Sequence, residues 1–226
     1  DAQESRGLGD VYKRQVLYNE NMFYGSKFVN RSDNKRGITR KKRKIIMGKY
    51  FGTDGFRGEA NVVLTVEHAF KVGRYLGWYF GQDHKARIVI GKDTRRSSYM
   101  FEYALAAGLT ASGADAYLLH VTTTPSVSYV VRTEDFDCGI MISASHNPFY
   151  DNGIKLINSK GEKMREDVIS EIEKYLDGEP ENIPYATKEN IGCTVDHTAG
   201  RNRYMGYLMS LSLIHISEPT RLLSIS

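Results

Sequence analysis

The sequence has few cysteines and lacks any long hydrophobic run. It contains only 2 cysteines in 226 residues, Cys138 and Cys193, and they form no Cys-x-x-Cys unit. We therefore expect reduced thiols and a cytoplasmic location. No apolar run reaches the roughly 18 residues of a membrane span, and no charged segment precedes a signal-peptide core. We expect no membrane partner.

The central part of the chain also lacks an excess of positive charge. The whole sequence has a formal net charge of +4, from 31 Lys+Arg and 27 Asp+Glu. Residues 1–46 hold 12 Lys+Arg and 5 Asp+Glu, and residues 212–226 hold one of each kind. This leaves 18 Lys+Arg and 21 Asp+Glu for residues 47–211. Without a basic surface we expect no nucleic-acid partner. These 165 residues are enough for one domain with a hydrophobic core.

Residues 139–157 hold the strongest candidate for a functional site. Apolar residues 139–142 and 154–157 predict two strands, and residues 143–153 predict a polar loop between them. In α/β proteins such loops carry the chemistry. Ser145, His146 and Lys155 supply a hydroxyl, an imidazole and an ammonium group, which suit nucleophilic or phosphoryl-transfer chemistry. On spacing alone, the same stretch also fits an ordinary turn.

Three motifs in order support a functional interpretation. Ser-Ala-Ser-His-Asn-Pro (143–148) with Asp-Asn-Gly-Ile-Lys (151–155) resembles the active-site serine loop of the phosphohexomutase superfamily. Gly-Thr-Asp-Gly-Phe-Arg-Gly (52–58) resembles the opening motif of that superfamily, and Gly-Lys-Asp-Thr-Arg-Arg-Ser (91–97) resembles its next element. The opening motif favours members that act on glucosamine phosphate over those that act on glucose or mannose phosphates.

Strand-like and helix-like sequence patterns alternate along the chain and predict the fold around the loop. We expect an α/β fold, a three-layer α/β/α domain with a mixed, mostly parallel sheet, as in phosphohexomutase domain I. Strand ends near residues 91, 122 and 143 should meet at one edge. The predicted strands are 87–90, 116–121, 139–142 and an antiparallel 154–157. The predicted helices are 65–80 capped by Thr65, one capped by Ser97 or Ser98 and stopped at Gly113, one beginning at Thr124-Pro125, 166–176, and 195–211.

The two ends differ from this domain. Residues 1–46 are polar, lack periodicity and end in a basic run, so a disordered arm is one interpretation. We prefer a translated leader, because Met47 opens the stretch at which members of the family typically begin. Residues 6–15 and 212–226 resemble translated sequencing adapter. We therefore expect domain I with the catalytic serine loop over 47–190, and over 191–211 a helix leading to a missing second domain.

The resemblance implies a role for each residue of the loop. Ser145 corresponds to a phosphoserine that gives its phosphoryl group to a sugar phosphate and takes another back, and Ser143 is the competing hydroxyl. His146 and Lys155 would move protons or neutralise charge beside it.

Arg57 and Arg95 would position phosphate or brace the loop, and Asn147 would hold the turn. The nearby acids are expected to be turn formers, not metal ligands; these are Asp54, Asp93 and Asp151.

The resemblance also implies Mg²⁺. In the family an Asp-Gly-Asp-x-Asp-Arg loop of the second domain binds it together with an oxygen of the phosphoserine, here Ser145. That loop is absent from this sequence, and one phosphate oxygen is too little for octahedral Mg²⁺.

The function implied is interconversion of glucosamine 6-phosphate and glucosamine 1-phosphate by a full-length parent protein, with this chain alone inactive. Its partner would be the phosphosugar substrate. Two alternatives stay open: a mutase of glucose or mannose phosphates, and a non-enzymatic phosphosugar-binding module.

Overall fold

The described part of the protein forms one mixed sheet with helices on both faces. The structure is a computed structural model that describes residues 48–179 and 183–216, with side chains as far as residue 211. Its strands are β1 (Phe51–Gly52), β2 (Gly55–Glu59), β3 (Arg87–Lys92), β4 (Asp115–Val121), β5 (Cys138–Ile142), β6 (Asp151–Asn158) and β7 (Thr194–Asp196). Its helices are α2 (Val66–Phe80), α3 (Arg96–Ala111), α4 (Thr124–Thr133), α5 (Glu166–Leu176), the short 3₁₀ helix η1 (Lys188–Asn190) and α6 (Thr198–Ile216).

The seven strands lie in the order β1-β2-β6-β5-β3-β4-β7. Strands β5, β3, β4 and β7 run parallel, whereas β6, β2 and β1 continue the sheet with antiparallel pairings. The carboxyl ends of the three central strands meet, since the amide of Asp93 donates to Ile142 and that of Thr122 donates to Lys92, both at 2.9 Å. The predicted convergence of strand ends is confirmed.

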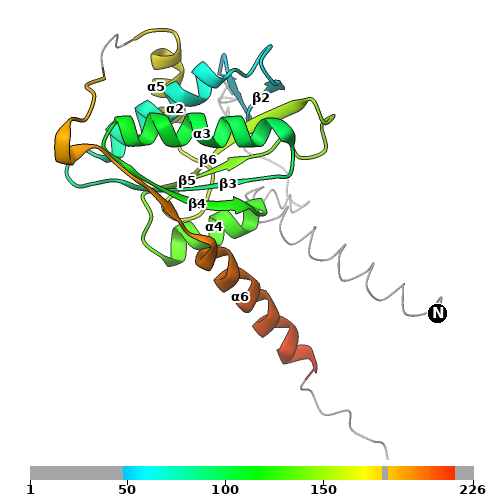
Figure 1. The fold of residues 1–226 in the computed structure, drawn as a ribbon. Coiled ribbons are helices and arrows are strands. Elements are labelled where there is room, and N and C mark those ends of the chain that lie inside the picture. Colours follow the sequence, from blue (N-terminus) through cyan, green and yellow to red (C-terminus); the bar gives the residue numbers. More distant parts are fainter. Residues whose placement is uncertain (1–47, 180–182, 217–226) are drawn as a thin grey trace, which may run out of the picture. The chain divides into compact units, whose positions relative to one another are not determined.

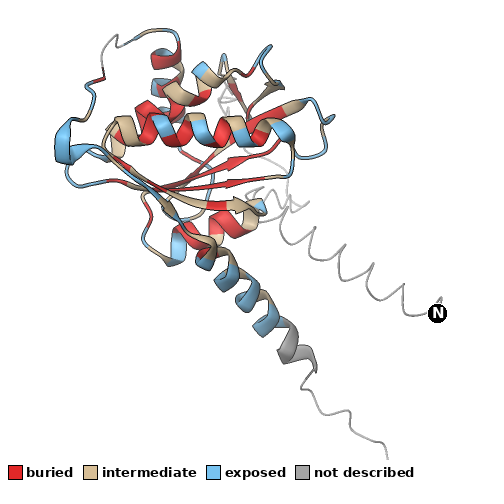
Figure 2. Cartoon of the chain, viewed as in Figure 1, coloured by how far each residue is buried: buried red, intermediate tan, exposed pale blue. Residues whose placement is uncertain are grey.

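The sheet is the middle of three layers. Figure 1 shows α2 and α3 on one face of the sheet and α4 on the other, with α6 leading away from the α4 side. The larger hydrophobic core joins α2, α3 and α5 to the sheet, and a smaller one joins α4 to the opposite face. The strands between these helices are mostly buried (Figure 2). The predicted α/β/α fold with a mixed sheet is confirmed.

Two glycines let α2 and α3 pack closely. A Cβ atom on Gly108 would overlap the carbonyl oxygen of Phe70, and one on Gly73 would overlap that of Leu105. Both glycines are buried. Larger residues there would force the two helices apart.

The predicted helix boundaries were partly right. Thr65 caps α2 as predicted, through a reciprocal pair of bonds with His68. The capping prediction for α3 was wrong, because the helix begins after Arg95 and has no side-chain cap. The hydroxyl groups of Ser97 and Ser98 are engaged instead by Asn152.

Three short strands were missed. β1 and β2 form a hairpin over the segment expected to be a loop, so Arg57 lies in a strand. The helix predicted from residue 195 begins at Thr198, because residues 194–196 pair with β4 as β7. The signal was weak, since β1 and β7 have only two and three residues, too few to show a period, and the five residues of β2 include two glycines, which are rare in strands.

The predictions for residues 1–46, Met47 and the tail beyond 216 lie outside the described residues. Within the described chain, no helix is long and apolar enough to cross a membrane.

Candidate active site

The serine loop connects β5 to β6 at the carboxyl edge of the sheet. Ser145 is exposed and has a φ of 58°, a left-handed conformation that costs a residue other than glycine about 1 kcal/mol or more. Its amide donates to the Oγ of Ser143 at 3.1 Å. This bond occupies Ser143 within the loop and leaves Ser145 as the accessible hydroxyl.

His146 lies next to this hydroxyl. Its Nδ1 is 3.5 Å from the Oγ of Ser145, a distance at the outer limit of a hydrogen bond. The imidazole is exposed. A neutral imidazole here has one nitrogen that accepts a proton and one that donates it, so His146 is within reach of a proton leaving or entering Ser145.

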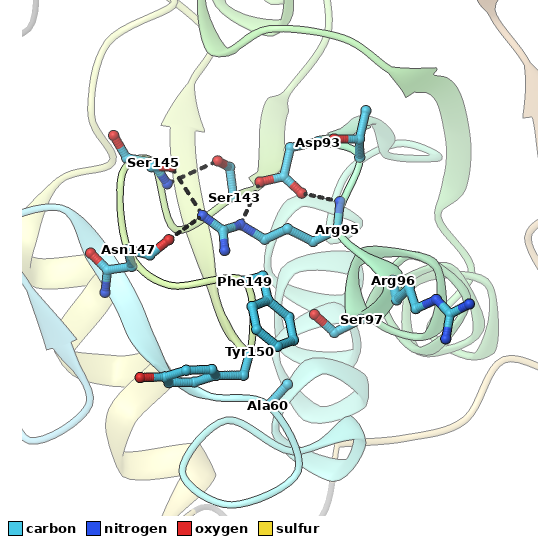
Figure 3. A pocket seen from close by; sticks show the side chains of 11 residues that line it. Ala60, Asp93, Arg95, Arg96, Ser97, Ser143, Ser145, Asn147, Phe149 and Tyr150 are labelled. Carbon is cyan, nitrogen blue, oxygen red and sulfur yellow. Dashed lines mark hydrogen bonds and ion pairs between the residues drawn. The ribbon is translucent and has the colours of Figure 1, made fainter.

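Arg95 holds the loop through its backbone. One guanidinium nitrogen donates to the carbonyls of Ser145 at 3.0 Å and Asn147 at 2.9 Å, and the other donates to those of Pro148 and Asp151. Figure 3 shows the guanidinium between the loop and Asp93. Because these donors are engaged, the geometry favours bracing of the loop over direct phosphate binding.

Asn147 closes the turn from within. Its amide group donates to the carboxylate of Asp151 at 2.9 Å, and its backbone amide donates to Ala144 at 3.1 Å. This is the geometry of a turn-holding residue.

Arg57 and Lys155 place two positive charges beside the base of the loop. Arg57 faces Gly153 across the β2–β6 pair, so Lys155, two residues further on, lies on the same face of the sheet. The stem of Arg57 and the carbonyl of Ser143 both flank Gly153, since each would contact a Cβ atom placed there. Hence the Arg57 side chain reaches the base of the serine loop.

The charge of this pair is incompletely balanced. Asp54 accepts from Arg57 at 3.0 Å, but the Nε of Arg57 is buried and has no partner among the described residues. Burial, and secondly the charge of Arg57, lower the pKa of Lys155, while Asp54 and Asp93 raise it by a smaller amount. An anion bound between these side chains would relieve both the unpaired donor and the repulsion.

A hollow of about 840 Å³ lies beside the loop, and Ser145, Asn147 and Arg95 are among the residues that line it. Figure 3 shows Phe149 and Tyr150 from the loop facing Ser97 and Ala60, with Arg96 at the start of α3. Arg57, His146 and Lys155 are not among its lining residues. The structure therefore places three of the six predicted site residues around this hollow and the other three outside its lining.

Sequence reasoning missed Asp93, Ser98 and Asn152 as site residues. Asp93 was expected only to form a turn, yet its carboxylate accepts from Arg95 and Ser98. Asn152 is fully buried and donates to Ser98 at 2.9 Å. The polar side chains of Ser98 and Asn152 are fully buried. Their burial is visible only in the structure, so the sequence offered no signal for them.

The described residues do not form a magnesium site. Within residues 48–179 and 183–211, no group of three or more His, Cys, Asp or Glu side chains is placed to hold a metal ion. Asp54, Asp93 and Asp151 instead bind Arg57, Arg95 and Asn147 respectively.

The fold is an α/β/α domain that presents an exposed serine on a braced loop at the carboxyl edge of its sheet. Residues 48–182 match the family model described as phosphoglucomutase/phosphomannomutase, alpha/beta/alpha domain I. The chain belongs to this family. Among curated relatives, it is 85% identical over 170 residues to a phosphoglucosamine mutase of Lachnospira eligens and 74% identical over 166 residues to one of Lachnoclostridium phytofermentans.

Solved structures agree on the fold. A putative phosphomannomutase from Thermus thermophilus shares 27% identity with a TM-score of 0.58, and covers 73% of this chain and 37% of its own. The two curated relatives cover 74% of this chain, which corresponds to 38% and 37% of their lengths. The chain thus spans less than half the length of the relatives that it matches.

Proposed function

We propose that a full-length protein carrying this domain interconverts glucosamine 6-phosphate and glucosamine 1-phosphate, with Ser145 as the phosphoryl carrier. The observation that carries the proposal is the exposed Ser145 hydroxyl on a braced loop, with the incompletely balanced charges of Arg57 and Lys155 at its base. The names of the 85% and 74% identical relatives support glucosamine as the sugar.

The reaction proceeds in two balanced transfers. Phospho-Ser145 gives its phosphoryl group to the free hydroxyl of the sugar monophosphate: the Ser145 O–P bond breaks, an O–P bond to the sugar forms, and the sugar proton returns to the serine oxygen. The bisphosphate then reorients, and its other phosphate passes back to Ser145 while a proton returns to the sugar.

Residues of this chain serve both transfers. His146 is placed to hold the proton in transit, since its Nδ1 faces the Oγ of Ser145 at 3.5 Å. Arg57 and Lys155 stabilise the negative charge of the transferring group, and Arg95 and Asn147 fix the loop so that the oxygen stays in line. One phosphate oxygen on Ser145 would serve as a ligand of Mg²⁺, whose charge would offset that of the phosphate; the other ligands must come from outside the described residues.

We also propose that this protein acts in the cytoplasm. Cys138 and Cys193 are both free thiols, which a reducing compartment preserves.

The test is a mutase assay of the full-length protein with glucosamine, glucose and mannose 6-phosphates. We expect glucosamine 6-phosphate to give the highest kcat/KM and Ser145→Ala to abolish turnover. Ser159→Ala, at an exposed serine in the turn after β6, is the matched control and should keep wild-type activity. A Ser145→Ala protein with the wild-type rate would refute the assignment, and a preference for mannose or glucose phosphate would refute the choice of sugar.

A further inference from the structure

The carboxylate of Asp93 is the junction of a hydrogen-bond network behind the serine loop. One oxygen accepts from the backbone amide of Arg95 at 3.1 Å and from the hydroxyl of Ser98 at 2.6 Å. The other accepts from the Nε of Arg95 at 2.9 Å. These bonds fix the plane of the guanidinium, because Nε is held while both terminal nitrogens point at the loop.

The same network also includes residues that follow the loop. Asn152, directly after the loop, is fully buried; its amide nitrogen donates to Ser98 at 2.9 Å, and its oxygen accepts from the amide of Gly153 at 2.8 Å. Ser98 in turn donates to Asp93. The start of the loop is tied to Asp93 through Arg95, and its end is tied to Asp93 through Ser98 and Asn152.

We propose that Asp93 is a positioning residue for phosphoryl transfer, which sets the conformation of the serine loop through Arg95 on one side and through Ser98 and Asn152 on the other. This role rests on the proposed function of Ser145. Asp93 itself does not touch the reacting oxygen in this network; it acts through the residues that it orients.

The network helps to hold the unfavourable backbone conformation of Ser145. A left-handed serine persists only where its surroundings hold it, and the Arg95 bond to its carbonyl is one of those restraints. Loss of the Asp93 carboxylate removes the acceptor of the Nε and backbone amide of Arg95 and of the Ser98 hydroxyl in a partly buried site, where unmade bonds are costly. The loop then samples other conformations, and the serine oxygen leaves the line of attack.

Asp93 has a second, electrostatic effect that separates its role from a general contribution to stability. Its charge is one of those that raise the pKa of Lys155 against burial and Arg57. Asp93→Asn removes this charge, so the pKa of Lys155 should fall further. Ser98→Ala breaks the network but keeps the charge, so that pKa should stay unchanged.

The experiment compares Asp93→Asn, Ser98→Ala and a matched control, Asp115→Asn. Asp115 also accepts a backbone amide bond, from Cys193, but it lies at the start of β4 away from the loop. Amide hydrogen exchange of residues 143–153 is measured in this chain, together with the pKa of Lys155 by NMR. The kcat and KM are measured in the full-length protein.

We expect Asp93→Asn to speed exchange of the loop about tenfold, as for loss of a partly buried charge-assisted contact, with α2 and α4 unchanged. The kcat should fall about a hundredfold with KM within about twofold, because the defect is misplacement of the oxygen and not loss of sugar contacts. Ser98→Ala should also speed exchange of the loop and lower kcat, but by smaller factors. Asp115→Asn should change neither the exchange of the loop nor kcat.

Unchanged exchange of the loop in both variants would overturn the inference, and so would a loosened loop with a wild-type kcat. Faster exchange spread evenly over the whole domain would assign Asp93 to general stability instead. If Ser145→Ala keeps its activity, the proposed function fails and the role in transfer fails with it. The exchange data from this chain would then show separately whether Asp93 orders the loop.

Discussion

Arg57 and Lys155 carry like charges on the same face of two adjacent strands, and the charge of Arg57 helps to lower the pKa of Lys155. Proteins seldom place two cations together without a purpose, because the arrangement costs stability. A phosphate held between them would convert repulsion into attraction. We therefore expect the proposed phosphoryl group to lie beside this pair.

Replacing Lys155 by Met should stabilise the domain at neutral pH by about 0.5–1 kcal/mol, as is common when a strained functional group is removed. The unfolded chain binds the proton of this lysine more tightly than the folded protein, because burial holds the pKa of Lys155 in the folded protein below the ordinary lysine value of 10.5. The destabilisation that Lys155 causes is therefore complete at pH values below its pKa in the folded protein. It is relieved as the pH rises towards 10.5.

Urea denaturation of Lys155→Met and wild type, at pH 7 and near pH 10.5, measures this difference. The exposed Lys160→Met is the matched control and should change stability little at either pH. A stabilisation by Lys155→Met that is independent of pH would show that charge is not its cause.

Phosphorylation of Ser145 should raise the pKa of Lys155. The phosphate adds about two negative charges, and a nearby anion favours the charged ammonium. An NMR titration of Lys155 with and without the phosphate measures the change, with the exposed Lys160 as the internal reference. Equal pKa values in the two forms would place Lys155 away from the phosphoryl group.

How far the sequence predicts this protein depends on how local each signal is. The serine loop and the α2 cap at Thr65 are contiguous patterns, so the sequence locates both. β7 is a three-residue strand that exists because it pairs with β4, and its three residues show no period. Asp93 is similar. Its neighbours in sequence indicate a turn residue, but in space it accepts from Ser98, to which Asn152 donates.

Glu173 should be essential for anchoring the first described residues. Its carboxylate accepts the backbone amides of Lys49, Tyr50 and Phe51, at 3.1, 2.7 and 2.7 Å. We expect Glu173→Ala to destabilise the domain by about 2 kcal/mol, the scale of hydrogen bonds to a charged group. Thermal denaturation checks this, with Glu171→Ala on the same helix as the control.

Glu171 is exposed and pairs only with Lys174 in the described chain, so its removal should cost less than about 0.5 kcal/mol. Equal effects of the two substitutions would contradict the anchoring role of Glu173.

Arg74 should be essential for docking the connector that follows α5. It is 1% exposed, and its guanidinium donates to the carbonyls of Ala111, Ile183 and Pro184 and to the hydroxyl of Ser112, so removal leaves several buried acceptors unpaired. We expect Arg74→Met to cost about 3 kcal/mol in the free energy of unfolding. Chemical denaturation measures it.

The matched control is Arg96→Met, at an exposed arginine for which the described chain provides no ion pair. It should change the free energy of unfolding by less than about 0.5 kcal/mol. A similar decrease in the free energy of unfolding in Arg74→Met and Arg96→Met would mean that the buried hydrogen bonds of Arg74 contribute little to stability.

The most direct test of the central claim is to map the phosphorylated residue in the full-length protein. The protein is incubated with glucosamine 1,6-bisphosphate that carries a ³²P label, then digested and sequenced by mass spectrometry. We expect label on Ser145, transferable to added glucosamine 6-phosphate and absent from Ser145→Ala. Label on Ser143 or on another residue, with Ser145 unmodified during turnover, would contradict it.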